Sequence, residues 1–322
     1  MIRRFDVADL ASIETRVSAW VSGCEPLMEV FRLNRDAYLD FAVKMTGIPY
    51  ESLERDIKSS DKDKKSAAKR HRQIAKPGVL GCVYQLGGGD LGKNRYGDIV
   101  KKGLWGYSEA MGVEMTKEQA HAIVRIFRES YREIPEMWYA LERAVADVLE
   151  EGTTRVKRQL GPAGCIRIDK VPFSDSAENR FILRIHLPSG RCLHYVDAEM
   201  QEVKMPWLDQ AGQEVYRKTL TYSGLDQETK VWKRGITSRG GKLFENVVQA
   251  IARDILAVKM LRFEEVGMEV IAHVHDEAVC ESVDCVFQPG YEDMVSIMSE
   301  PVSWAKNLCL GADGFAGAYY HK

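Results

Sequence analysis

Residues 268–282 read MEVIAHVHDEAVCES. Two dense apolar runs, rich in β-branched residues, flank the polar group His275-Asp276-Glu277. Such runs around a short polar turn are typical of a β-hairpin. The stretch therefore predicts two antiparallel strands whose connecting turn presents Asp276.

The sequence on either side of this hairpin adds helices and strands. Upstream, residues 241–263 have the apolar spacing of an amphipathic helix, whose polar stripe contains Asn246 and Gln249. The first residues, IRRFDVAD, predict a strand ending at Asp9. A mostly helical stretch should follow over 13–47, and short β-like runs fill 153–240. We predict an α/β (α+β) fold with an antiparallel sheet.

Composition excludes several classes of protein. The 322 residues are 45% hydrophobic and 29% charged, with a net charge of -2, as in an ordinary globular protein. The seven cysteines have no C-x-x-C spacing, which disfavours a disulfide framework and fits a reducing cytosol. No apolar run of about 18 residues and no signal peptide stand out, so we expect a cytoplasmic protein without a membrane span.

Basic charge is concentrated in one segment. Residues 55–76 hold nine Lys or Arg and three Asp, and we expect SSDKDKKS at 59–66 to be a charged loop. Beyond it, Arg72, Lys76, Leu80 and Tyr84 recur every four residues, so a helix would align them in one stripe. Two cations and an aromatic ring suit a triphosphate and a base. The alternative is a solvated helix face, which such spacing often produces.

Two carboxylates lie at the ends of predicted strands. Asp9 ends the first strand and Asp276 lies in the hairpin turn. Each alone is more often a turn residue than a ligand. If the fold brings them together, they can hold two Mg2+ ions, because Mg2+ prefers a few carboxylates together with phosphate oxygens.

Three segments together resemble motifs A, B and C of the DNA polymerase I family (family A), in the family's order. They are D-L-A-S-I-E-T-R at 9–16, R-Q-I-A-K-P-G-V-L-G-C-V-Y-Q at 72–85 and V-H-D-E at 274–277. GGKLFENVVQAIARD at 240–254 and P-V-S-W-A at 301–305 further resemble phage-type members. The resemblance covers nearly the whole chain, most weakly between about 150 and 240.

The resemblance implies a polymerase palm with an antiparallel sheet and a mostly helical fingers domain. The palm would consist of residues 1–19, which contain the first motif, and residues 241–322, which contain the third. Fingers would be 20–152, and 153–240 a β-rich insertion or palm extension. The implied activity is template-directed DNA synthesis, in which deoxynucleotides are transferred to a primer 3′-hydroxyl.

The resemblance also implies a role for each matched residue. Asp9 and Asp276 would be the catalytic carboxylates that bind two Mg2+ ions, with Glu277 a nearby carboxylate. Glu14 would exclude ribonucleotides. The incoming nucleotide would be bound by Arg72 and Lys76 at its triphosphate, and Leu80 and Tyr84 belong to the same nucleotide-binding stripe. DNA would be contacted by His275 near the primer terminus and by Gln249 and Asn246 in the minor groove.

Four positions depart from the family pattern. Leu80 replaces an aromatic residue, Gln85 replaces Gly, and Tyr38 replaces a His that touches phosphate. Pro77 follows Lys76, so we expect the helix to begin or kink there.

The first motif begins nine residues from Met1, which leaves no room for a thumb. We therefore expect a split polymerase, in which a separate subunit supplies the thumb and exonuclease, in the bacterial or phage-infected host cytosol. The alternatives are a start set by the boundary of the sequence, a single-subunit RNA polymerase and a non-catalytic architectural replication subunit. Glu14 and Glu277 argue against the RNA polymerase, and intact Asp9 and Asp276 argue against loss of catalysis.

Overall fold

The computed structural model describes seven stretches of the chain, and all structural statements refer to them. They are residues 3–94, 96–151, 157–173, 180–208, 211–226, 229–283 and 289–320, without the side chains of 206–208. The chain divides into two compact units, and each is described by itself. Unit 1 comprises Met1–Ala37 and Val248–Lys322, and unit 2 comprises Tyr38–Val247.

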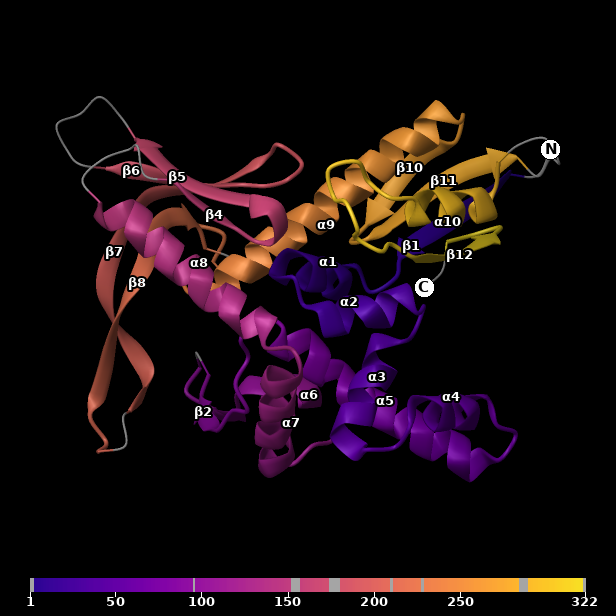
Figure 1. Ribbon diagram of the computed structural model, residues 1–322, viewed down its shortest axis with the longest axis horizontal. Helices are drawn as coiled ribbons and strands as arrows, with labels where there is room; N and C mark the ends of the chain where they lie inside the picture. Colours follow the sequence, from indigo (N-terminus) through magenta and orange to yellow (C-terminus); the bar gives the residue numbers. More distant parts are fainter. Residues whose placement is uncertain are drawn as a thin grey trace. The chain divides into compact units, whose positions relative to one another are not determined.

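Unit 1 is built on a four-stranded antiparallel sheet (Figure 1). The strand order is β10-β11-β1-β12, so β1, from the N-terminus, lies between two strands from the C-terminal part. In this order the strands are Glu269–Val274, Glu277–Val283, Arg3–Leu10 and Ala312–Gly317. The helices are α1 (Ile13–Ser22), α2 (Glu25–Arg32) and α10 (Tyr291–Ser299).

The predicted hairpin and first strand are present in unit 1. The central residues Asp6, Val7 and Ala8 of β1 are all buried, so both faces of the strand are covered there, and α10 lies against β1 and β12. The predicted amphipathic helix is α9 (Gly240–Glu265), along which the chain passes from unit 2 to unit 1.

Unit 2 has two parts. One is helical and includes a small β-hairpin, and the other is rich in β-strands. The helical part comprises α3 (Ala37–Thr46), α4 (Tyr50–Lys58), α5 (Lys62–Cys82), α6 (Gly103–Ala110), α7 (Lys117–Ser130) and α8 (Glu133–Glu150), with β2 (Leu91–Lys93) paired to β3 (Ile99–Lys101). Its interior is aromatic: the ring of Phe127 lies 5.9 Å from that of Phe41 and 5.2 Å from that of Tyr131.

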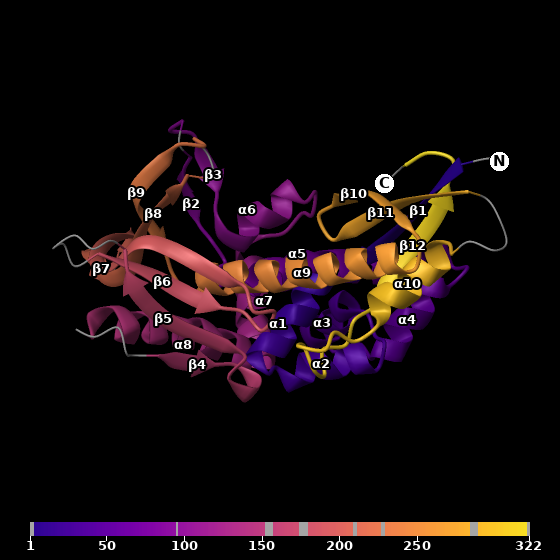
Figure 2. The same cartoon turned by 90° about the horizontal axis from the view of Figure 1, so that it is seen from above.

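The β-rich part of unit 2 is a six-stranded antiparallel sheet in the order of the chain, as the short β-like runs predict. Helix α8 covers one face of it (Figure 2). Lys170 of this sheet is buried and donates to the carbonyl oxygen of Leu149 at the end of α8. The elements are β4 (Arg158–Leu160), η1 (Pro162–Gly164), β5 (Ile166–Pro172), β6 (Phe181–His186), β7 (Cys192–Leu208), β8 (Glu214–Leu225) and β9 (Trp232–Ser238).

Helix α5 differs from the sequence prediction in two ways. The segment 59–66 is not a loop, because α5 begins at Lys62, and Asp61 caps it by accepting from the backbone N–H groups of Asp63 and Lys64. The helix also does not begin at Pro77 but continues through it to Cys82.

Packing explains why α5 tolerates Pro77, which removes one helix hydrogen bond at a cost of about 3 kcal/mol. Pro77 and Gly78 are both buried. A Cβ atom on Gly78 would lie 2.7 Å from Ile123 and 3.0 Å from Phe41, so glycine lets the helix approach these side chains closely. Tertiary contact therefore outweighs the local preference.

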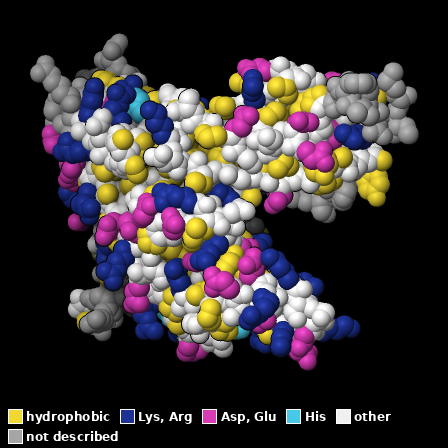
Figure 3. All heavy atoms as spheres, turned by 45° about the vertical axis from the view of Figure 1, so that its right-hand side comes forward, with side chains coloured by type: hydrophobic (Ala, Val, Ile, Leu, Met, Phe, Trp, Pro, Cys, Tyr) yellow, Lys and Arg dark blue, Asp and Glu magenta, His cyan; other side chains and the backbone are white. Residues whose placement is uncertain are grey.

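The boundaries proposed for palm and fingers remain predictions, and the boundary at 152/153 lies outside the described residues. In the described part of the chain, no helix has the length and apolarity that a membrane span requires. Acidic and basic side chains are interspersed over the face in Figure 3, as expected for a net charge of -2.

Candidate active site

Asp9 lies near the end of β1, one of the two central strands of the unit 1 sheet. Across the sheet, Asp9 is directly opposite Glu277 of β11 on one side and Asp313 of β12 on the other. Directly opposed residues project from the same face of an antiparallel sheet. Three acidic side chains from distant parts of the sequence therefore form one row.

The hairpin turn brings Asp276 to the same end of β1. Val274 pairs with Glu277, so the turn consists of His275 and Asp276. The backbone N–H of Leu10, next to Asp9, donates to the carbonyl oxygen of Asp276 at 3.2 Å. The two carboxylates predicted to bind metal thus lie on adjacent backbone segments.

Both segments contain a residue with left-handed backbone. His275 has φ 55° and Ser12, which follows β1, has φ 52°. This conformation is uncommon for residues other than glycine. At His275 it follows from the two-residue hairpin turn, which favours positive φ at its first residue.

The environments of the three carboxylates differ. Glu277 is 3% exposed, Asp9 is half-buried and Asp313 is exposed. The hydroxyl of Tyr320 donates to Oε1 of Glu277 at 2.7 Å. That hydrogen bond is the main cause of a raised pKa of Tyr320, with smaller contributions from burial and from the negative charges of Glu277 and Asp9.

Arg16, the last residue of the first motif, anchors the chain beside this row. Its guanidinium donates to the carbonyl oxygens of Ala11 at 2.8 Å and Cys309 at 2.9 Å, and it lies 4.4 Å from the centre of the Phe31 ring. Burial lowers the pKa of Arg16. It therefore fixes the turn after β1 against the segment that leads into β12. Glu14, in the first turn of α1, is half-buried.

The donor set fits Mg2+. Asp9 and Asp276 offer carboxylate oxygens, the ligands that this ion prefers, and one or two such groups suffice when substrate phosphates complete the coordination. Among the described residues, no group of three or more His, Cys, Asp or Glu side chains is arranged to hold a metal.

The turn position of His275 allows its side chain to be tested apart from the fold. We predict that His275→Gly leaves the free energy of unfolding within about 1 kcal/mol of the original, because glycine adopts positive φ without strain. Primer extension should fall if the imidazole contacts the primer terminus. Chemical denaturation and extension rates measure the two effects. A large loss of stability would contradict the assigned backbone conformation.

The predicted nucleotide-binding stripe lies on α5 in unit 2. The guanidinium carbon of Arg72 lies 5.2 Å from the centre of the Tyr38 ring, and Nζ of Lys76 lies 6.0 Å from it. Tyr38 therefore contacts both cations of the stripe. Sequence comparison singles out Tyr38 only as a departure from the family pattern and gives no sign of this contact.

The remaining members of the stripe lie at the end of α5. Leu80 is half-buried, and Tyr84 follows the helix, its ring 6.4 Å from that of Phe244. Gln85 has φ 69° and its side chain accepts from the backbone N–H of Gly241 at 2.9 Å. Positive φ is the conformation for which the family's glycine at this position is suited.

The two predicted minor-groove residues have different surroundings on α9. Gln249 is exposed. Asn246 is half-buried, and its amide donates to the hydroxyl of Tyr195 at 2.9 Å. Burial raises the pKa of Tyr195 well above its usual range. Asn246 thus has a structural partner within unit 2, whereas Gln249 presents its amide to solvent.

The contact with Tyr38 predicts a modest effect on nucleotide binding. A cation over an aromatic face contributes about 0.5–1 kcal/mol at exposed sites. We expect Tyr38→Leu to raise the KM for deoxynucleotides about two- to fivefold, while Tyr38→Phe retains most of the affinity because it keeps the ring. Steady-state kinetics test this. Equal effects of the two substitutions would show that the hydroxyl, not the ring, matters.

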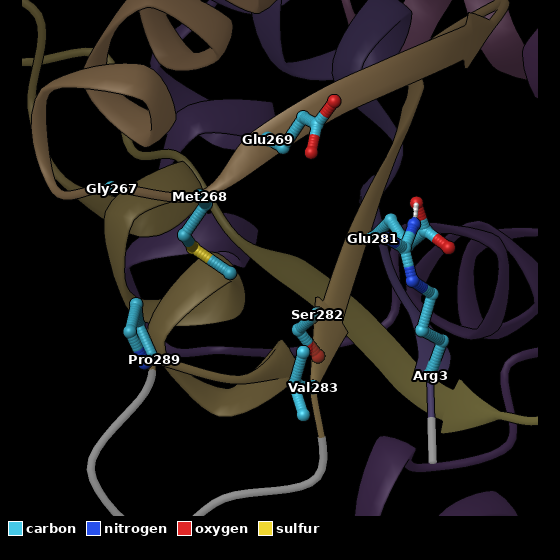
Figure 4. A pocket seen from close by; sticks show the side chains of 8 residues that line it. All are labelled: Arg3, Gly267, Met268, Glu269, Glu281, Ser282, Val283 and Pro289. Atoms are coloured by element: carbon cyan, nitrogen blue, oxygen red, sulfur yellow. Dashed lines mark hydrogen bonds and ion pairs between the residues drawn. The ribbon is translucent and has the colours of Figure 1, made fainter. Parts of the chain in front are cut away.

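A separate pocket of about 180 Å³ lies at the other end of the unit 1 sheet (Figure 4). Its rim includes Arg3, whose guanidinium pairs with Glu281 at 2.8 Å. Arg3 begins β1 and Asp9 lies near its end, so this pocket is distinct from the carboxylate row. No predicted site residue lines it.

Comparison with known proteins finds a phage protein and a solved structure that are similar to this chain. The DNA polymerase of Bacillus phage SP02 is 33% identical over 319 residues, which are 99% of this chain. The predicted resemblance to the polymerase portion of family A DNA polymerases is confirmed. This chain spans 41% of the length of the phage polymerase. No protein-family model matches the sequence.

A solved structure has a similar fold. The POL domain of Pol1 from M. smegmatis, in complex with DNA primer-template and dNTP, matches 98% of this chain and 39% of that chain with a TM-score of 0.51. The sequences are 14% identical, so this match concerns the fold alone. The predicted α+β class, with an antiparallel sheet and a helical part, is confirmed.

Proposed function

We propose that this chain is the catalytic part of a DNA-directed DNA polymerase. It would add deoxynucleotides to a primer 3′-hydroxyl on a DNA template by a two-metal mechanism. The observation that carries this proposal is the convergence of Asp9 and Asp276 at one end of the unit 1 sheet. The similarity to a phage DNA polymerase over 99% of the chain supports it.

In this proposal Asp9 and Asp276 hold the metal ions through carboxylate oxygens. Two bound Mg2+ ions would activate the attacking hydroxyl and neutralise charge on the leaving pyrophosphate. Glu277 stays beside Asp9 as a fixed negative group. Arg72 and Lys76 bind the triphosphate, so that the reacting groups are positioned and their charge is neutralised.

The other assigned residues select and orient the substrates. Glu14 limits the space beside the sugar, while Leu80 and Tyr84 lie along the nucleotide-binding stripe. His275 would contact the primer terminus. Gln249, with Asn246, would contact the minor groove, where acceptor positions are similar for all base pairs, so that base-pair shape rather than sequence is tested.

The proposal includes a second protein. The chain spans 41% of the length of the phage relative. We propose that a separate subunit, in the host cytosol, supplies the thumb and exonuclease. Affinity purification of the tagged chain from its source, followed by mass spectrometry, would identify such a subunit. Recovery of the chain without a polymerase-related partner would contradict this part of the proposal.

Primer extension tests the activity itself. A labelled primer-template is incubated with Mg2+ and deoxynucleotides, with the purified chain alone and with proteins co-purified from its source. Extension that needs the chain supports the polymerase, and dependence on added protein supports the second subunit. Preference for ribonucleotides would indicate an RNA polymerase instead. No extension in any mixture would indicate an architectural subunit.

A further inference from the structure

Tyr320, near the C-terminus, contacts the carboxylate row although no sequence motif includes it. Its hydroxyl donates to Oε1 of Glu277 at 2.7 Å. Glu277 is directly opposite Asp9 in the sheet and is 3% exposed. Tyr320 is 39% exposed, so its ring is partly accessible while its hydroxyl binds a buried oxygen.

The path of the chain makes this contact specific. Strand β12 ends at Gly317, which is opposite Phe5. Phe5 and Asp9 are four residues apart on β1, a separation of about 13 Å at the usual rise of a strand. Three further residues span at most about 10 Å, so the chain must turn back and the Tyr320 side chain must supply the remaining reach. A frayed terminus would not place a hydroxyl on Glu277.

We propose that Tyr320 is a positioning residue for the metal site, acting by holding the Glu277 carboxylate in one orientation beside Asp9. This inference rests on the proposed polymerase function. Adjacent carboxylates repel one another, and a buried carboxylate needs a hydrogen-bond donor. The Tyr320 hydroxyl is such a donor, and it directs one oxygen of Glu277 away from competition with Asp9 for the cation.

The test compares Tyr320→Phe with Tyr319→Phe. The first removes the hydroxyl and keeps the ring. The second makes the same chemical change at the neighbouring tyrosine, which is 71% exposed. Binding of Mn2+ to the protein on primer-template, measured by electron paramagnetic resonance, gives a readout independent of turnover. We expect Tyr320→Phe to weaken Mn2+ binding about three- to tenfold, which corresponds to the net contribution of one typical hydrogen bond.

Kinetics distinguish positioning from a general structural effect. For Tyr320→Phe, the Mg2+ concentration for half-maximal extension should rise by a similar factor, whereas the KM for deoxynucleotides should not change. In a protein that already carries Glu277→Gln, adding Tyr320→Phe should have little further effect on Mn2+ binding, because the two residues act as one unit. Tyr319→Phe should leave the Mn2+ affinity unchanged.

The outcomes separate this inference from the proposed function. If the original protein extends primers and Tyr320→Phe binds Mn2+ with unchanged affinity, the positioning role is wrong. It is also wrong if Tyr320→Phe and Tyr319→Phe lower the Mn2+ affinity equally. The same holds if Tyr320→Phe has its full effect in a protein that already carries Glu277→Gln. If the original protein extends no primer in any mixture, the polymerase proposal itself fails.

Discussion

Replacing Asp9 with asparagine is expected to reduce primer extension about a thousandfold while leaving the protein as stable as before. The carboxylate is a proposed ligand of both metal ions, and metal neutralisation of transition-state charge is worth several kcal/mol. A loss of about 4 kcal/mol corresponds to a factor of about a thousand in rate. Asparagine keeps the shape of the side chain and removes its charge.

Stability distinguishes a catalytic from a structural aspartate. Asp9 lies directly opposite both Glu277 and Asp313, and like charges in opposed positions destabilise a sheet. Removing the central charge relieves this repulsion. We therefore expect the midpoint of thermal unfolding to stay constant or rise. Replacing an aspartate with a structural role would instead lower the midpoint of thermal unfolding.

The measurement pairs rapid-quench primer extension with thermal unfolding. Asp56→Asn on α4, a helix of unit 2 that carries no predicted site residue, is the matched control and should retain full activity. Asp276→Asn should lose as much activity as Asp9→Asn. If Asp9→Asn kept more than a tenth of the original rate, the assigned role of the carboxylate would have to be abandoned.

Local sequence patterns predict the elements that carry the site better than they predict its contacts. The hairpin around His275 and Asp276 follows from dense apolar runs on both sides of a polar turn, and both strands are where the pattern puts them. The pairing of Asp9 with Glu277 joins residues far apart in the chain. Periodicity contains no information on such a register, and only the resemblance to a family indicated that these carboxylates meet.

The errors on α5 arise from rules that consider only neighbours in sequence. Charge density suggested a loop over 59–66, although Asp61 offers a helix cap. Proline chemistry suggested a break at Pro77, but the close approach of Gly78 to Phe41 and Ile123 keeps the helix continuous. Long-range packing decides the second and is visible only in the folded chain, whereas the cap at Asp61 is a local contact with Asp63 and Lys64.

Contacts of aromatic hydroxyls and rings were also beyond sequence analysis. Tyr38 precedes Arg72 by 34 residues and Tyr320 follows Glu277 by 43, and neither separation has a local signal. The C-terminal tail reads simply as rich in glycine and aromatic residues. Only the three-dimensional structure shows that Tyr320 in this tail donates a hydrogen bond to Glu277.

Substitution of the two cations on α5 should affect nucleotide binding far more than folding. Arg72 is half-buried and Lys76 is exposed, and the cations of both lie near the ring of Tyr38. A charged group that binds phosphate through charge-assisted hydrogen bonds contributes about 1.5–3 kcal/mol. We expect Arg72→Ala and Lys76→Ala each to raise the KM for deoxynucleotides about 10- to 100-fold.

The same helix provides the control for this prediction. Arg70→Ala removes an exposed cation two residues from Arg72, which is on another face of α5. It changes the net charge by the same amount, so any general loss of attraction for nucleotides or DNA appears equally in all three variants. Nucleotide titrations at saturating primer-template measure the KM of each. If Arg70→Ala raised the KM for deoxynucleotides as much as Arg72→Ala, the effect would be one of nonspecific charge and not of a triphosphate site. An unchanged KM for Arg70→Ala would locate nucleotide binding on the face of α5 that carries Arg72 and Lys76.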